Sequence, residues 1–364
     1  MVWSRVLTFT DPLPCQAAIL SADVEILRTS KDNFRTEITQ VRADRLWTER
    51  FHVSSAQVCT IASKPGRRSI AFLTTSNSSR LQHCGIEILP GDIIIDGFDP
   101  VHRRSGSGLD YGSMSLPMGE LDSLAASILG REFGKKLAPR IVHPHPGSMS
   151  RLLAIHKVVG QLAHETPEII QVPGVFRALE NELVDVMIRC LAESTNVEGS
   201  TRDRRHEAII TKFEDFLAAN PDRPLYLSEI CSGIGVAERT LRASCEEHLG
   251  MGPIRFLTLR RMHLARRALL AADAGKTSVT RIVTDHGFWE LGRFSVAYRT
   301  LFGESPSETL RRPPETRSPR NFSDRGAQSR IGLPKSRRPP RRGNIVAPRF
   351  PIRNYPGTTV ANDA

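Results

Sequence analysis

The feature that most constrains this fold is a pattern that occurs twice between residues 224 and 312. Each copy predicts a short helix, a tight turn at a glycine, a second helix and a stop made of glycine followed by proline. Glycine suits the turn because it tolerates positive φ, and Gly followed by Pro ends a helix and keeps it ended. The first copy comprises 227–232, Gly235, 238–249, Gly250 and Pro253; the second comprises 279–285, Gly287, 291–302, Gly303 and Pro306. The pattern therefore predicts two helix-turn-helix units, preceded by a lead-in helix over 207–218.

A basic helix is predicted between the two units, over residues 253–270. Its apolar residues recur at helical spacing, and Arg260, Arg261, Arg266 and Arg267 fill other positions. At about 1.5 Å per residue this helix spans about 27 Å. Successive major-groove faces on one side of a duplex lie about 34 Å apart. A connector of this length could hold two reading helices in adjacent grooves, which indicates DNA binding.

Three stretches carry a resemblance to a known family. Residues 225–242 read Leu-Tyr-Leu-Ser-Glu-Ile-Cys-Ser-Gly-Ile-Gly-Val-Ala-Glu-Arg-Thr-Leu-Arg, and 249–257 read Leu-Gly-Met-Gly-Pro-Ile-Arg-Phe-Leu. The third, 284–308, contains Gly-Phe, Phe-Ser, an aromatic residue, Phe-Gly and Ser-Pro in that order, which is highly specific. About a quarter of the chain thus resembles the arabinose-regulator (AraC/XylS) family of bacterial transcription regulators.

The resemblance implies which residues contact DNA. It makes the helix from Glu238 the first recognition helix and the helix from Glu290 the second. Arginine can bridge guanine O6 and N7, glutamate can accept from cytosine N4, and hydroxyls more often contact phosphate. The base-reading candidates are Glu238, Arg239, Arg242, Glu290, Leu291, Arg293 and Arg299, and the phosphate-contact candidates are Thr240 and Ser295. The alternative is that the exposed arginines only make the surface soluble. For Arg260 and Arg267, this role and a contact with DNA are equally supported.

Other residues of this region are predicted to be structural. A set at core spacing is expected to pack the two units: Ile230, Ile234, Leu241, Cys245, Ile282, Phe288, Phe294, Tyr298, Leu301 and Phe302. Tyr226, Ala237 and Trp289 stand where many family members have a helix-capping or helix-starting hydroxyl residue. Loss of such a cap typically costs about 1 kcal/mol. Cys245 replaces the usual core aromatic residue, so the first unit is expected to be the less stable.

The N-terminal part is predicted to be mainly β. Short apolar or alternating runs separated by turn residues read as strands at 58–62, 69–75, 86–89 and 93–95. Pro90 and Gly91 suit the second and third positions of a turn, which predicts a hairpin between the last two strands. The region is expected to be a barrel or sandwich, and the Leu-Pro-Gly-Asp turn at 89–92 resembles the cupin-type sensing domains of the same family.

Helices are predicted to follow the strands, at 120–129, 148–165 and 173–193. The last two could form a dimer interface or only cover the β domain. The predicted fold class is thus α+β: an N-terminal cupin-like barrel with flanking helices and a C-terminal all-α domain of two helix-turn-helix units joined by a linker helix. The expected organisation is 1–145 sensing domain, 146–195 helical segment, 196–206 linker, 207–312 DNA-binding domain and 313–364 tail.

The tail holds most of the chain's excess positive charge. Residues 313–364 carry eleven Lys or Arg against three acidic residues, out of a net charge of +11 for the chain, together with nine of its 24 prolines. Such a basic, proline-rich segment is expected to be disordered and to attract polyanions without specificity.

Enzyme chemistry finds little support in the sequence. The six cysteines form no Cys-x-x-Cys pair and read as buried apolar residues, and the one His-x-His pair, His143 and His145, lies in a proline-rich loop. No cofactor, metal or catalytic residue is predicted. No secretion signal or apolar run long enough for a membrane span is found, so a cytoplasmic protein without membrane contact is expected.

The predicted function is a sequence-specific transcription regulator, an activator controlled by a small-molecule effector or by dimerisation. Its expected partners are double-stranded promoter DNA, a second copy of the chain, RNA polymerase and an effector of unknown identity. Two alternatives remain: a cupin-type enzyme or metal-dependent module fused to a DNA-binding domain, and an N-terminal domain that only mediates protein interaction.

Overall fold

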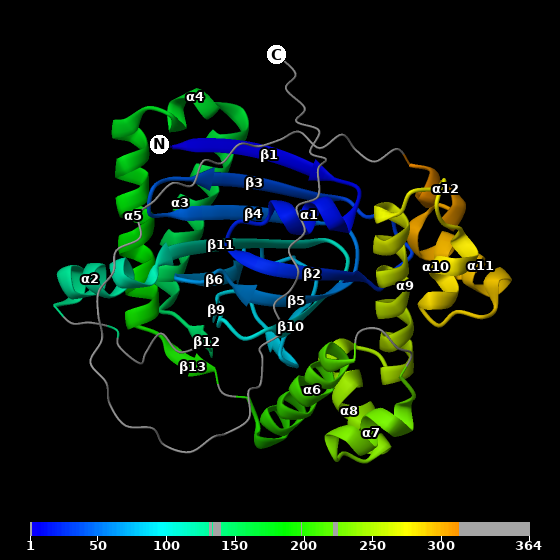
Figure 1. The fold of residues 1–364 in the computed structure, drawn as a ribbon. Coiled ribbons are helices and arrows are strands. Elements are labelled where there is room, and N and C mark those ends of the chain that lie inside the picture. Colours follow the sequence, from blue (N-terminus) through cyan, green and yellow to red (C-terminus); the bar gives the residue numbers. More distant parts are fainter. Residues whose placement is uncertain (1, 131–132, 134–139, 198, 221–224, 313–364) are drawn as a thin grey trace, which may run out of the picture.

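The computed structural model describes residues 2–130, 133, 140–197, 199–220 and 225–312. Two antiparallel sheets occupy the centre, helices α2 to α5 lie on one side, and the C-terminal helices lie on the other (Figure 1). The predicted α+β class, with N-terminal sheets and C-terminal helices, is confirmed. The predicted disordered tail, 313–364, lies outside the described residues.

The two sheets are antiparallel throughout. The larger has the order β1-β3-β4-β11-β6-β9-β12-β13 and the smaller β2-β5-β10-β7-β8. The strands of the larger sheet are β1 Trp3–Phe9, β3 Thr36–Arg42, β4 Trp47–Val53, β11 Leu109–Pro117, β6 Arg67–Leu73, β9 Ile93–Ile95, β12 Arg140–His143 and β13 Thr195–Val197. Those of the smaller sheet are β2 Ala22–Arg28, β5 Gln57–Ser63, β10 Val101–Ser105, β7 Leu81–His83 and β8 Ile86–Ile88.

The inner strands of the larger sheet are buried on both faces, as β9 illustrates. Successive side chains of a strand point to opposite faces. Ile94 packs in the core between the two sheets, with Phe51 and Ile61. Ile93 and Ile95 pack on the opposite face, in a second core formed with the helices. A strand buried on both sides needs a continuous apolar run, which is what the three isoleucines provide.

The turn at Leu89–Asp92 forms as predicted, but the predicted hairpin is wrong. The Asp92 amide donates to the Leu89 carbonyl at 3.0 Å, and Gly91 has φ +103. However, β8 pairs with β7 in the smaller sheet, whereas β9 pairs with β6 and β12 in the larger sheet. The turn therefore carries the chain from one sheet to the other.

Helices cover the outer face of the larger sheet. Leu152 of α3 and Leu183 and Met187 of α5 pack in one core with Phe72 and Met114 of the sheet. The predicted helices at 120–129, 148–165 and 173–193 are thus found, and the latter two cover the sheet. The helices are α2 Met118–Leu129, α3 Pro146–Glu165, α4 Pro167–Ile170 and α5 Pro173–Ala192; α1, Pro12–Ala18, lies between β1 and β2.

The segment 196–206, predicted to be a linker, contains regular structure. It includes the end of β13 and the start of α6, Thr201–Ala219, so the lead-in helix begins earlier than the predicted residue 207. The reason is a capping box, in which Ser200 Oγ accepts from the Asp203 amide and the Asp203 carboxylate accepts from the Ser200 amide. The described helices include none that is long and apolar enough to cross a membrane.

Candidate nucleic-acid interface

The first helix-turn-helix unit is built on α6, α7 (Leu227–Ile234) and α8 (Glu238–Leu249). Its core contains Phe213 of α6, Ile230 of α7, and Leu241 and Cys245 of α8, all fully buried. Gly235 ends α7 with φ +66, as the tight turn requires. Sequence reasoning thus places this core correctly, although Ile234 is only partly buried.

The second unit comprises α10 (Val279–Asp285), α11 (Leu291–Phe302) and α12 (Pro306–Arg311). Ile282, Phe294, Tyr298 and Phe302 are buried, and Phe288 packs against them half-buried. The Tyr298 hydroxyl lies 2.9 Å from Thr309 Oγ1, which satisfies both buried polar groups. Gly303 ends α11 with φ +78, and Pro306 begins α12. The predicted bounds of these helices are reproduced.

The two recognition helices lack side-chain N-caps. Ala237 caps α8 and Glu290 caps α11, and neither side chain accepts a helix amide. The expectation that Trp289 occupies the cap position is wrong, because the cap lies one residue later. Tyr226, as expected, caps α7 without a side-chain bond. Since no side chain caps these helices, the amides of their first residues can donate to phosphate.

Linker helix α9, Pro253–Ala271, joins the units, and two of its arginines contact the β domain. Arg266 is buried and pairs with Asp11 of the β domain and, at 3.0 Å, with Glu304. Arg267 pairs with Glu25 of β2 at 2.8 Å. These two arginines therefore join the linker helix to the β domain, and an Arg267 contact to DNA is not supported.

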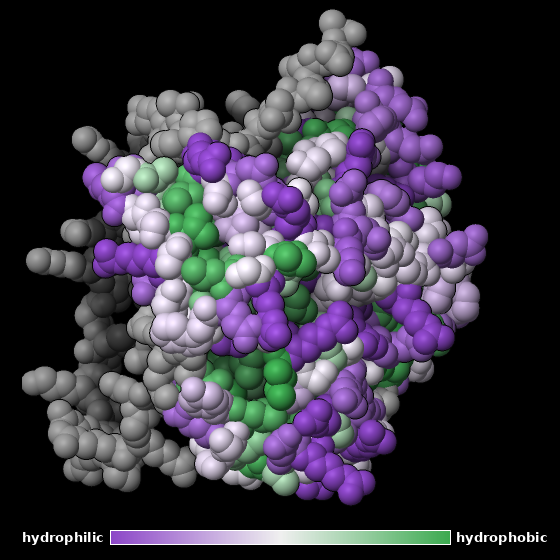
Figure 2. Space-filling model, turned by 90° about the vertical axis from the view of Figure 1, so that its right-hand side faces the viewer, coloured by the Kyte–Doolittle hydropathy of each residue, from purple (hydrophilic) through white to green (hydrophobic). Residues whose placement is uncertain are grey.

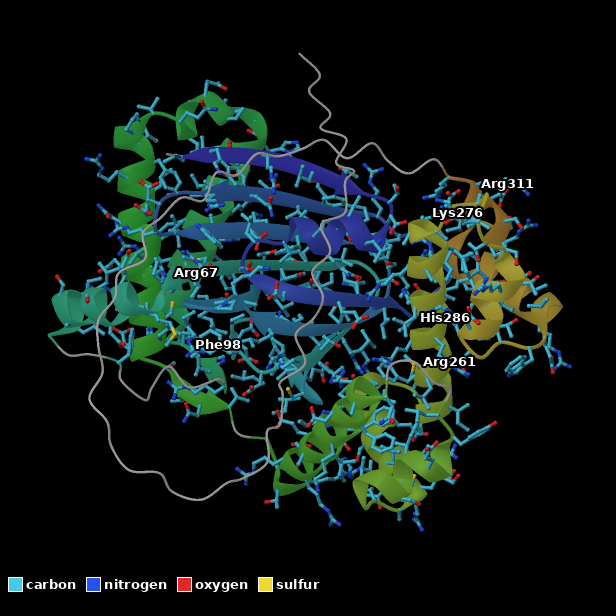
Figure 3. The ribbon with its side chains drawn as sticks, viewed as in Figure 1. Arg67, Phe98, Arg261, Lys276, His286 and Arg311 are labelled. Atoms are coloured by element: carbon cyan, nitrogen blue, oxygen red, sulfur yellow. The ribbon has the colours of Figure 1, made fainter. Side chains whose placement is uncertain are left out.

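Arg261 holds the second unit onto the linker helix. Its Nη1 donates to the Gly287 carbonyl at 3.4 Å, and its guanidinium lies over the Phe288 ring at 5.2 Å. Figure 3 shows Arg261 and His286 near each other at the side of α9, with Lys276 and Arg311 at the end of the second unit that is farther from the first. Since Gly287 is the turn glycine, Arg261 fixes the turn that aims α11.

The residues predicted to contact DNA lie on the first turns and outer faces of α8 and α11. Two intrahelical or cap-to-helix ion pairs, Glu238–Arg242 and Glu290–Arg293, each measure 2.8 Å. All of the candidates are exposed except Thr240, which is half-buried: Glu238, Arg239, Arg242, Glu290, Leu291, Arg293, Ser295 and Arg299. These pairs hold Arg242 and Arg293 beside the helix surface, and each guanidinium keeps further N–H donors for a base edge or a phosphate.

Two further residues of the second unit were missed by sequence reasoning. Trp289 and Val296 are 76% and 70% exposed, beside and on the second recognition helix. Both fall outside the core spacing of this unit, which is the signal that could have identified them. Figure 2 shows this side of the molecule, where hydrophilic side chains predominate and hydrophobic patches lie between them. Apolar groups at this place suit contact with a thymine methyl or a sugar.

The histidines of the proline-rich loop have structural contacts. His143 ends β12, and its Nδ1 lies 2.9 Å from Asp92 Oδ1. His145 caps α3, its Nδ1 accepting from the Gly147 amide at 3.2 Å. Within the described ranges no cluster of three or more His, Cys, Asp or Glu side chains is arranged to hold a metal ion.

Comparison with known proteins agrees with this geometry. The helix-turn-helix domain family matches residues 230–312. A probable thc operon regulatory protein of Rhodococcus erythropolis is 40% identical over 136 residues, or 35% of this chain and 41% of that protein. XylDLEGF operon transcriptional activator 2 of Pseudomonas putida is 33% identical over 95 residues, or 26% of this chain and 60% of that protein. The alignments thus span less than two thirds of either relative.

Solved structures give a weaker likeness. The AraC-like transcriptional activator CuxR covers 78% of this chain and is itself covered completely, with 17% identity and a TM-score of 0.37. A probable AraC family regulator from Rhodopseudomonas palustris is 30% identical over 28% of this chain, with a TM-score of 0.26.

The fold and the matched region define a protein with a double helix-turn-helix DNA-binding domain. Over this domain, the chain is similar to transcription regulators of the AraC/XylS type.

Proposed function

We propose that this protein is a sequence-specific DNA-binding regulator that activates transcription. The observation that carries the proposal is the arrangement of two exposed recognition helices, α8 and α11, on either side of one continuous helix of 19 residues. At about 1.5 Å per residue, this helix is about 28 Å long, which suits successive major-groove faces. The names of the Pseudomonas putida relatives, which are transcriptional activators, support activation.

The arginines of the two recognition helices are proposed to read base edges. Arg239 and Arg242 serve the first helix, and Arg293 and Arg299 serve the second. Glu238 and Glu290, released from their ion pairs, accept from cytosine, whereas Thr240 and Ser295 contact phosphate. Leu291 and the neighbouring Trp289 supply apolar contact.

The β domain is proposed to control this activity, through an effector or through dimerisation. Exposed apolar side chains on the helical layer, Val158, Val172 and Val175, support a homodimer contact there. As an activator bound at a promoter, the protein would contact RNA polymerase.

Footprinting of the full-length protein on the intergenic DNA beside its own gene, across a salt series, tests the proposal. We expect protection of two major-groove segments about 10 base pairs apart for each subunit. Arg239→Ala with Arg293→Ala should abolish this protection, whereas Arg177→Ala, an exposed arginine of α5, should leave it intact. Protection that is uniform along the DNA and disappears with salt would contradict the proposal, because it reports only charge.

A further inference from the structure

A pocket lies between the β domain and the first helix-turn-helix unit. It is an open hollow of about 300 Å³, which is at the lower end of small-molecule sites. Figure 1 shows β10 running toward α6 and α8 at this place. One wall comes from the smaller sheet and its loops, and the other comes from the junction of α8 and α9. The lining residues are Thr29, Ala56, Arg80, Gln82, Arg104, Ser105, Gly106, Leu249, Gly250, Met251 and Arg255.

The pocket is strongly basic. Arg80 and Arg104 come from the β domain and Arg255 from the first turn of α9, and no Asp or Glu is among the described lining residues. Arg80 has an exposed side chain, whose Nε lies 3.4 Å from the carboxylate of Glu87. Three guanidinium groups around one hollow favour an anion, because arginine binds carboxylate and phosphate through paired N–H donors.

Arg104 is the most tightly held of the three arginines. Its guanidinium donates to the Gln82 side-chain oxygen, and it packs so closely on Gly250 that a Cβ there would collide with it. Burial lowers the pKa of Arg104. Among the described residues no carboxylate forms an ion pair with it, so a half-buried positive charge faces this pocket with a neutral partner.

We propose that this interdomain pocket binds a small organic anion, a carboxylate or a phosphate ester, between Arg104 and Arg80 on one side and Arg255 on the other. The bound anion links the β domain to the end of α8 and the start of α9. The site is a regulatory one only if the proposed function holds, whereas anion binding itself does not depend on DNA binding. The bound state fixes the angle between α8 and the β domain.

Calorimetric titration of the full-length protein, without DNA, with citrate and with glucose 6-phosphate tests the site. We expect saturable binding of at least one of these anions and none of glucose, the neutral counterpart. Arg255→Gln, which changes an exposed side chain and should fold normally, is expected to weaken binding at least tenfold, as is Arg104→Gln. The charge-matched control, Arg177→Gln, should bind as the unchanged protein does.

The outcomes separate the possible ligands and the two proposals. Citrate binding alone identifies a carboxylate site, and glucose 6-phosphate binding alone identifies a phosphate-ester site. Absence of saturable binding by both anions, or equal binding by the Arg255→Gln, Arg104→Gln and Arg177→Gln proteins, would overturn the inference. Because DNA is absent, this failure would leave the footprinting result unaffected, and a failed footprint would leave anion binding standing.

Discussion

At the residue scale, arginines of one domain have opposite environments. Arg293 is exposed and pairs with Glu290 on the surface, whereas Arg266 is buried between Asp11 and Glu304. An exposed pair contributes little to stability, but removing one member of a buried pair leaves a charge without compensation. The first arginine is therefore available for recognition, and the second is structural.

Arg293→Ala is expected to lower the affinity for the specific site by about 1–3 kcal/mol if the residue reads a base. Competition binding on specific and random DNA measures this effect, with Arg177→Ala as the charge-matched control. An equal loss on both DNAs would assign Arg293 to phosphate instead.

Arg266→Ala is expected to destabilise the protein by about 3 kcal/mol, because it leaves the half-buried Asp11 carboxylate without its guanidinium partner, whereas Glu304 keeps its pair with Arg312. Burial raises the pKa of Asp11, but the hydrogen bond and the positive charge of Arg266 together lower it by more, so the pKa lies below its usual value. The stability that this pair gives is thus present above the usual carboxylate pKa of about 3.9 and is lost as the pH falls below it. Urea unfolding compares this variant with Arg267→Ala, whose pair with Glu25 is more exposed; equal losses would contradict the argument.

At the element scale, the two recognition helices end alike but in different surroundings. Both α8 and α11 stop at a glycine with positive φ, +69 at Gly250 and +78 at Gly303. A Cβ at Gly303 would meet no heavy atom within 4 Å, whereas one at Gly250 would collide with Arg104. The local conformation is the same, and only Gly250 is also an interdomain contact.

Gly303→Ala is expected to cost about 1–2 kcal/mol, the penalty for a side chain in the left-handed region. Gly250→Ala should cost more, because the Arg104 side chain must also move. Thermal unfolding of the two variants, and of Gly250→Ala combined with Arg104→Ala, forms the test. If adding Arg104→Ala does not remove the extra loss of stability of Gly250→Ala over Gly303→Ala, the contact with Arg104 is not the cause of that loss.

At the scale of the whole molecule, buried histidines lie where the β domain meets the first unit. His102 of β10 lies 3.3 Å from Glu214 of α6, and His206 lies 2.7 Å from Glu247 of α8. His248 is buried beside His206 and Gly85. Burial lowers the pKa of His248 to about 4, and the neighbouring imidazoles of His102 and His206 act in the same direction, against the opposing charge of Asp203.

The interface is therefore expected to weaken in acid. Because the folded pKa of His248 lies below the unfolded value of about 6.5, the unfolded chain takes up the proton first. Stability is then full above pH 6.5 and falls as the pH decreases toward about 4, by up to about 3 kcal/mol. Urea unfolding between pH 7.5 and 4 should show a smaller decrease for His248→Gln than for His52→Gln, an exposed control. The same decrease in both variants would exclude His248 as the cause.

The sequence by itself determined the local elements. The glycine stops, the apolar spacing and the family pattern located α7 to α11 and the exposed faces of α8 and α11, because helix ends and amphipathic faces depend on neighbours within a few residues. The same reasoning found the turn at Leu89–Asp92. It could not assign β8 and β9 to different sheets, since a turn fixes the local direction of the chain but not the partner of each strand.

Only the tertiary structure decided what joins the two domains. The local sequence does not indicate what Arg266, Arg267 and Arg104 contact, yet they meet Asp11, Glu25 and Gly250, which are distant in sequence. Trp289 and Val296 were left exposed because the core of the second unit is completed without them. Charge pairing and burial depend on which segments the fold brings together, and no local pattern encodes that proximity.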